Sequence, residues 1–140
     1  MSLITPAALS THIYAEVLSQ ITRGDVTVAQ SAIDTAEHEI KMYLSRYDVV
    51  TMFAQYRSPD PLLAALIKDV ACWHIIRLAN PAIDYSMFRT AYEDALATLK
   101  NIMTGQAQPQ GWPYLDTTSE TAVQGDSISW NSNPKRSNFY

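Results

Sequence analysis

The stretch PLLAALIKDVACWHIIRLAN, residues 61–80, decides the fold of this chain. Its strongly polar side chains are Lys68, Asp69, His74 and Arg77. On a helical wheel at about 100° per residue they scatter around the helix and leave no wide polar face. A helix that is apolar nearly all round is normally enclosed by other elements. We therefore predict an all-α fold, a small bundle of about four helices around this central helix.

The ends of the same stretch are those of a helix inside a protein and not of a membrane span. Pro61 suits the first helical turn, and Pro81 follows as a stop signal. Lys68 and Asp69 interrupt the apolar run well short of the roughly 18 residues that a bilayer requires. The sequence therefore predicts no membrane partner.

Three further helical patterns surround the central one. A short helix over residues 5–22 is expected to break near residues 10–14, and an amphipathic helix is expected over residues 28–47. A last helix runs from about residue 85 to 103 and is ended by Gly105. These patterns supply the helices that enclose residues 61–80.

Two packing details follow from the pattern between residues 28 and 61. Glu37 and Lys41 lie on the polar face of the amphipathic helix, so both are expected to be solvent-exposed. The connection that follows is expected to be ordered against the core without forming a strand. Its predicted contacts with the core are Val50, Phe53 and Tyr56.

The helical composition stops after Gly105, which divides the chain into a helical core domain, residues 1–105, and an extended arm, residues 106–140. Disordered segments contain few aromatic residues, whereas this arm contains several. The side chains expected to bind a partner are Trp112, Tyr114, Ile128, Trp130, Lys135, Arg136, Phe139 and Tyr140. From the residues alone, packing of the arm on its own core and packing on a neighbouring subunit are equally favoured.

Chemical motifs are missing from the sequence. His38 lacks the second histidine four residues later that a helical zinc site needs, because position 42 is methionine. Cys72 and His74 are two residues apart, so they point to opposite sides of a helix. We predict no catalytic, cofactor-binding or metal-binding residue, and hence no enzyme.

Asp69 and Trp73 are expected to be structural. A carboxylate in the most apolar helix is costly to bury unless it is paired, and the expected partners are arginines. The candidates are Arg46, Arg57, Arg77 and Arg89. Cys72, the single cysteine, is expected to be a buried apolar residue in a reducing compartment.

Charge and the opening residues narrow the class further. The net charge of −4 argues against a protein that holds nucleic-acid phosphates by a broad basic face. The first residues carry no lysine or arginine and no continuous apolar run, so no secretory or transit peptide is readable. A cytoplasmic product is expected.

Several strings carry a resemblance to a known family. They are ITPAAL at residues 4–9, ITRGD at 21–25, AIDTAEHEIKMYLSRYD at 32–48, RSPDPLLAALIKDVACWHI at 57–75 and FRTAYEDALATLKNIMTG at 88–105. Over residues 3–105 the chain resembles a family of small tailed-phage and prophage proteins. These occur in Mu-like prophages as a domain of unknown function and are similar in plan to phage head-to-tail connector (adaptor) proteins.

The resemblance implies a structural role. Copies of the domain would form a homo-oligomeric ring on the portal, contact the tail-completion proteins and line the DNA passage without binding DNA specifically. The protein would be in the host cytoplasm during assembly and then at the head–tail junction of the virion.

Two other classes of protein fit the sequence less well than a connector does. A small helical DNA-packaging accessory or DNA-binding protein would need a basic helix face, whereas the polar face of residues 28–47 is acidic overall. An enzyme would need Asp69, His74 or His38 to converge in a pocket. The connector interpretation is the one we favour.

Overall fold

The computed structural model describes residues 2–54, 58–79 and 84–116, and within them it confirms the all-α prediction. The elements are a 3₁₀ helix η1 (Pro6–Thr11), α1 (Ala15–Thr22), α2 (Val26–Tyr43), α3 (Val49–Met52), α4 (Pro61–Ile76) and α5 (Ser86–Thr104). No strand occurs in these ranges, and the one β-bridge described joins Tyr47 to Tyr114.

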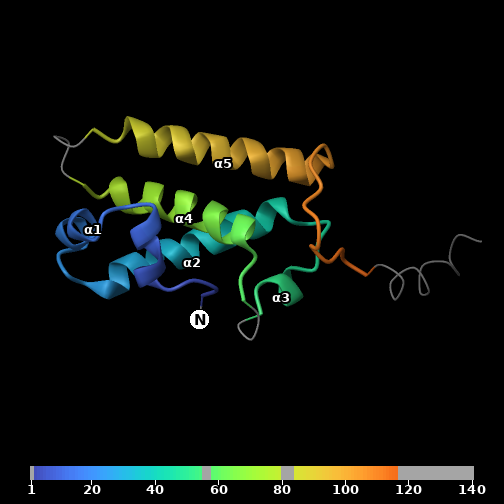
Figure 1. The fold of residues 1–140 in the computed structure, drawn as a ribbon, viewed down its shortest axis with the longest axis horizontal. Helices are drawn as coiled ribbons and strands as arrows, with labels where there is room; N and C mark the ends of the chain where they lie inside the picture. Colours follow the sequence, from blue (N-terminus) through green and yellow to red (C-terminus); the bar gives the residue numbers. More distant parts are fainter. Residues whose placement is uncertain (1, 55–57, 80–83, 117–140) are drawn as a thin grey trace, which may run out of the picture.

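Helix α4 is the central packing element of the bundle. It lies between α5 and α2 (Figure 1) and also packs against α1 and η1. Ile67, Val70 and Ile75 are fully buried in it, as expected for a helix without a polar face. The burial of Cys72 in this helix also confirms its prediction. Burial raises the pKa of its thiol to about 12, so the thiol is unreactive near neutral pH.

Aspartates begin three of the helices. Asp25 accepts a hydrogen bond from the Thr27 amide at 2.9 Å, and Asp60 accepts from the Leu62 amide at 3.0 Å. Asp48 begins α3 in the same way, with the Thr51 amide as donor. Each carboxylate satisfies an amide that has no partner inside its helix. The hydroxyl and amide of Thr27 also lower the pKa of Asp25.

The amphipathic helix ends earlier than its pattern predicts. Helix α2 stops at Tyr43, and the Leu44 amide bonds back to the Lys41 carbonyl at 3.2 Å. The chain then turns so that Leu44 and Tyr47 both enter the core. Local periodicity extends the helix to Tyr47, but the turn is decided by pairing with the distant segment that includes Tyr114.

The connection after α2 reaches the core through different residues from those predicted. Val50 is 81% exposed, so its predicted contact is wrong. Met52 is buried in its place, because the short helix α3 turns Val50 outward. Phe53 is partly buried as expected, with the Lys41 Nζ 4.7 Å from the ring centroid. The predicted contact of Tyr56 lies outside the described residues.

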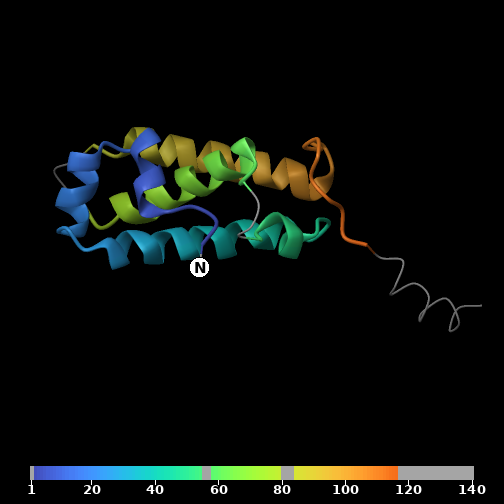
Figure 2. The ribbon, with the colours of Figure 1, turned by 60° about the horizontal axis from the view of Figure 1, so that its bottom comes forward.

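The predicted exposure of Glu37 is also wrong. The N-terminal segment crosses beside α2 and α4 (Figure 2) and covers this side chain. Glu37 Oε1 accepts a hydrogen bond from the Leu3 amide at 2.5 Å. Burial raises the pKa of the carboxyl, while the Leu3 amide and Lys41 oppose that shift. A helix wheel cannot foresee this, because the covering segment comes from 34 residues away.

We expect Glu37→Gln to be at least as stable as the wild type at pH 7, because the amide keeps an oxygen acceptor without a buried charge. The folded-state pKa of Glu37 is raised, so the proton is held more tightly in the folded protein. The stability it contributes is therefore present below the ordinary glutamate pKa of about 4.3 and lost as pH rises through the folded pKa. Urea unfolding of both proteins between pH 3 and pH 7, a range that includes the ordinary glutamate pKa of about 4.3, measures this difference. The glutamine variant should be the more stable protein only at pH values above the folded pKa of Glu37.

Glu37→Ala is the matched control for that comparison. It leaves the Leu3 amide without an acceptor and is expected to cost about 1 to 3 kcal/mol. An alanine variant as stable as the glutamine variant would contradict the role of the hydrogen bond.

Among the described residues, no helix has both the length and the hydropathy that are needed to cross a bilayer.

Candidate functional site

The most elaborate polar cluster joins three helices. Glu39 of α2 bonds through Oε2 to His74 Nε2 of α4 at 2.8 Å, and its Oε1 accepts from the Tyr92 hydroxyl of α5 at 2.7 Å. All three side chains are partly buried. Both carboxylate oxygens are thus occupied, which ties α2, α4 and α5 together at one level of the bundle.

Aromatic rings complete this cluster. Trp73 stacks on Tyr92 with centroids 5.7 Å apart and an interplanar angle of 23°, while His74 meets Tyr92 edge-on at 6.2 Å. Burial, together with donation to Glu39, raises the pKa of the Tyr92 hydroxyl to about 12. The hydroxyl is therefore a fixed donor at neutral pH. Trp73, which the sequence predicts to be structural, thus packs on Tyr92 within this cluster.

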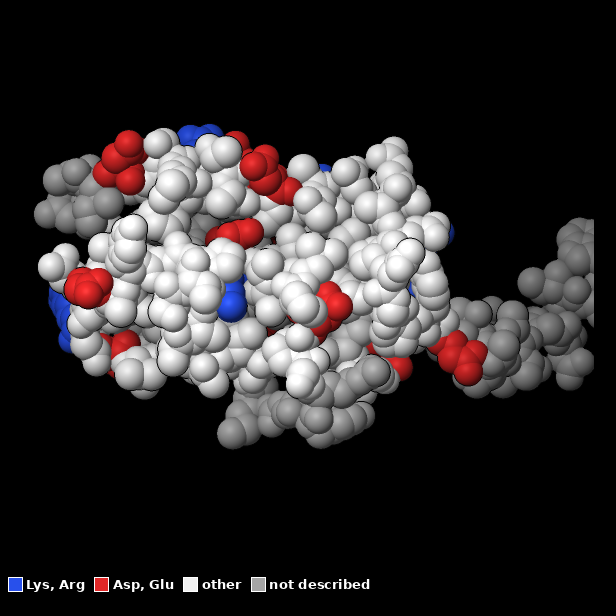
Figure 3. Space-filling view, viewed as in Figure 1, with Lys and Arg blue, Asp and Glu red and all other residues white. Residues whose placement is uncertain are grey.

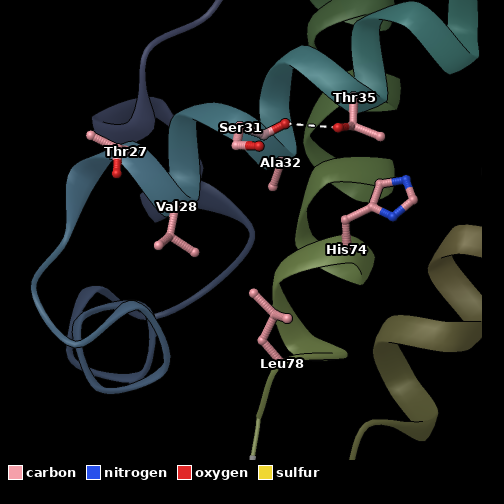
Figure 4. A pocket seen from close by; sticks show the side chains of 7 residues that line it. All are labelled: Thr27, Val28, Ser31, Ala32, Thr35, His74 and Leu78. Carbon is pink, nitrogen blue, oxygen red and sulfur yellow. Dashed lines mark hydrogen bonds between the residues drawn. The ribbon is translucent and has the colours of Figure 1, made fainter.

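A shallow groove of about 400 Å³ lies beside the cluster. It is lined by Thr27, Val28, Ser31, Ala32, Thr35, His74 and Leu78 (Figure 4). The Thr35 hydroxyl is used within α2, where it donates to the Ser31 carbonyl at 2.8 Å. His74 is the one ionisable group on the wall, and its Nε2 is held by Glu39. The Thr35 hydroxyl is thus used within α2, and His74 is used in the contact between helices.

Metal binding finds no ligand set in the described ranges. No group of three or more His, Cys, Asp or Glu side chains there is placed to hold an ion. His38 is exposed, and its Nδ1 lies 2.7 Å from the Asp34 carbonyl. It does not approach His74, which bonds to Glu39 instead.

Asp69 has a different partner from the predicted arginines. His12 Nε2 lies 3.5 Å from Asp69 Oδ1, and both side chains are partly exposed. Burial raises the pKa of the Asp69 carboxyl, His12 opposes this, and Asp94 adds to it. Among the described residues the partner of Asp69 is therefore a histidine and not an arginine, because His12, in the break between η1 and α1, lies over α4.

None of the arginines in the described ranges forms the ion pair with Asp69. Arg89 pairs with Glu93 at 3.0 Å, and the guanidinium of Arg46 lies against Gly105. Arg77 is the C-cap residue of α4. Arg57, the fourth candidate, falls outside the described residues.

The start of the predicted arm folds onto the bundle. The Asp48 amide donates to the Pro113 carbonyl at 2.9 Å, and the Leu115 amide donates to the Arg46 carbonyl at 3.0 Å. Helix α5 ends at Thr104 with Gly105 at φ 83°, as predicted, but packed structure continues to at least residue 115. This pairing explains why α2 ends early.

Trp112 and Tyr114 occupy opposite environments in this segment. Trp112 is 6% exposed and meets Tyr47 edge-on at 5.6 Å, whereas Tyr114 is 57% exposed and stacks on Tyr47 at 5.0 Å. Trp112 therefore belongs to the core of its own chain, and Tyr114 remains accessible. The other predicted partner-binding residues lie outside the described residues: Ile128, Trp130, Lys135, Arg136, Phe139 and Tyr140.

Exposed apolar side chains gather at the two ends of the bundle. Tyr14 and Met87, near α1 and the start of α5, are 79% and 70% exposed. Helix α3 lies toward the opposite end of the bundle from α1 (Figure 1), and it carries the exposed Val50. The segment that follows α5 bonds to the chain just before α3 and carries the exposed Tyr114 and Leu115. Sequence reasoning missed Tyr14 and Met87. Each lies at the start of a helix and outside the apolar stripe of that helix. This position is the signal that could have indicated their exposure.

Acidic atoms are spread over the face drawn in Figure 3, with smaller areas of basic atoms between them. This distribution agrees with the net charge of −4.

Comparison of the chain with protein-family models, with curated proteins and with solved structures gave no match.

Proposed function

We propose that this protein is a structural assembly subunit of a phage or prophage, a head-to-tail connector or head-completion adaptor. Copies would form a ring on the portal and line the passage for DNA. The observation that carries the proposal is that exposed apolar side chains lie at opposite ends of the bundle, Tyr14 and Met87 at one end and Val50 and Tyr114 at the other.

Patches at opposite ends favour head-to-tail contacts between copies. A contact between two different surfaces of one protein is heterologous, and repeated heterologous contacts close into a ring when the rotation per subunit allows it. An isologous dimer would instead need one self-complementary patch. The placement of Tyr14 and Met87 away from Val50 and Tyr114 supports the first arrangement.

The charge of the surface supports passage of DNA without retention. Acidic side chains repel the phosphate backbone, whereas a DNA-binding protein needs clustered lysine and arginine. The polar cluster around Glu39 is accounted for by its bonds to His74 and Tyr92. These bonds support a structural role, in which the cluster holds α2, α4 and α5 together, better than a catalytic role.

Native mass spectrometry of the full-length protein with its matching portal protein tests the proposal. We expect a complex that contains several copies of this chain per portal ring. Met87→Glu is expected to weaken the association between copies at least tenfold, because a charge placed in an apolar contact must be desolvated (about 1.4 kcal/mol per tenfold change).

The control for this experiment is Ala97→Glu, which adds the same charge at an exposed position ten residues further along α5. It should assemble as the wild type does. A strict monomer that ignores the portal protein would overturn the proposed function.

A further inference from the structure

An apolar groove of about 400 Å³ opens at the α1 end of the bundle. Its walls come from the break between η1 and α1, the end of α4 and the start of α5. The apolar side chains that line it are Ile13, Tyr14, Val17, Ile76, Met87 and Phe88. Tyr14 and Met87 stand at the rim with most of their surface exposed. An apolar surface of this kind marks a binding site more often than a bare face of a monomer.

Acidic groups slightly outnumber basic ones around the groove. His12 on the wall pairs with Asp69, whose carboxyl is also influenced by Asp94. Asp84 lies at the start of α5, where it accepts from the Ser86 amide. The basic groups are Lys68, which donates to the Thr11 hydroxyl at 3.1 Å, and Arg77, which directly follows the lining residue Ile76.

Arg89, which follows Phe88, is neutralised by Glu93 at 3.0 Å. An occupant that is both aromatic and basic would therefore complement the groove.

The last fourteen residues of the chain, SISWNSNPKRSNFY, have this chemistry. They combine apolar and aromatic side chains with two basic residues and contain no acidic residue: Ile128, Trp130, Lys135, Arg136, Phe139 and Tyr140. The rest of the chain is acidic, because the whole carries a net charge of −4. Residues 127–140 are therefore the segment of this protein best matched to the groove.

Chain length decides between the groove of the same chain and that of a neighbour. The described chain ends at Asp116, beyond the C-terminal end of α5, while the groove lies at the N-terminal end of α5 (Figure 1). Helix α5 alone is about 28 Å long. Residues 117–129, which precede Trp130, span at most about 45 Å when fully extended and about 20 Å as a coil. Return of Trp130 to the same groove would require the linker to stretch well beyond its coil length, whereas a neighbour can approach the arm.

We propose that this groove binds residues 127–140 of a second copy of the chain, with Trp130 in the apolar floor and Lys135 and Arg136 toward Asp69. The inference rests on the proposed function, which it deepens by naming the contact between copies. Because each copy offers a groove at one end and an arm at the other, the contact is head-to-tail.

Photo-crosslinking of the full-length protein tests this contact. A photoreactive benzoylphenylalanine replaces Met87, and ¹⁴N-labelled and ¹⁵N-labelled copies are mixed before irradiation. We expect crosslinks from position 87 to residues 127–140, half of them joining peptides of different isotopic labels in an equal mixture. Trp130→Glu should reduce their yield at least fivefold. Crosslinks in which both peptides always carry the same label would place the arm on its own chain and overturn the proposal.

A photoreactive residue in place of Ala97, which is exposed ten residues further along α5, is the control. It should give no crosslink to residues 127–140; the same crosslinks from both positions would overturn the assignment to the groove. Portal binding is measured on the same samples. A portal complex without exchange crosslinks overturns this inference alone, whereas absence of any portal complex overturns the proposed function.

Discussion

Trp112→Ala is expected to lower the free energy of unfolding by about 3 kcal/mol, the range measured when large aromatic side chains are removed from a core. The indole is buried edge-on against Tyr47 and faces a groove that Met52 and Leu63 also line. Removing it would leave a cavity where the chain after α5 meets the turn after α2. Urea unfolding followed by circular dichroism measures the change.

Two variants separate the packing of Trp112 from other effects. The indole N–H is buried and has no hydrogen-bond partner among the described residues, so Trp112→Phe is expected to cost clearly less than the alanine variant. Tyr114→Ala removes an exposed ring that stacks on the same Tyr47 and is expected to cost below about 1 kcal/mol. Equal losses for Trp112→Ala and Tyr114→Ala would contradict the packing described here.

Shortened chains extend this comparison. A chain that ends at Asp116 keeps Trp112 and the two hydrogen bonds to residues 46 and 48. We expect it to unfold at the same urea concentration as the full-length protein. A chain that ends at Gly105 lacks this packing and should be destabilised at least as much as Trp112→Ala.

Glu39→Ala is expected to cost about 2 kcal/mol, because it leaves His74 and Tyr92 without their shared acceptor. The expected loss is no larger because Glu39, His74 and Tyr92 are only partly buried. Tyr92→Phe removes one of the two bonds and keeps the ring on Trp73, so about half of that loss is expected. Both values are obtained from urea unfolding at pH 7.

Glu93→Ala is the matched control, since it also removes a glutamate that bonds to a neighbour. Its partner Arg89 lies four residues away on an exposed face, where such a pair contributes about 0.5 kcal/mol or less. If Glu39→Ala were as mild as Glu93→Ala, the tie between the three helices would not contribute to stability.

The local features of the fold were predictable from the sequence. The glycine after α5, the proline that begins α4 and the break near His12 each depend on neighbouring residues, and the structure has them where the pattern indicates. The central position of α4 was predictable for a related reason. Its composition leaves no polar face for water, whatever elements surround it.

Contacts between distant segments were not predictable in this way. Glu37 lies on the polar side of a helix wheel and is nevertheless buried, because Leu3 crosses over it. No motif in the sequence links Glu39 with His74, and only the packing of α2 against α4 and α5 makes them one cluster with Tyr92. Asp69 was expected to bond to an arginine, but His12, from the segment between η1 and α1, lies beside it.

The sequence by itself determined that the chain forms a helical bundle around residues 61–76, because burial of an all-apolar helix follows from composition and periodicity. Only the tertiary structure decided that Trp112 closes the core, that Tyr114 remains exposed and that apolar side chains gather at opposite ends. These outcomes depend on which segments meet after the chain turns. Periodicity along one helix carries no information about the segment that will cover it.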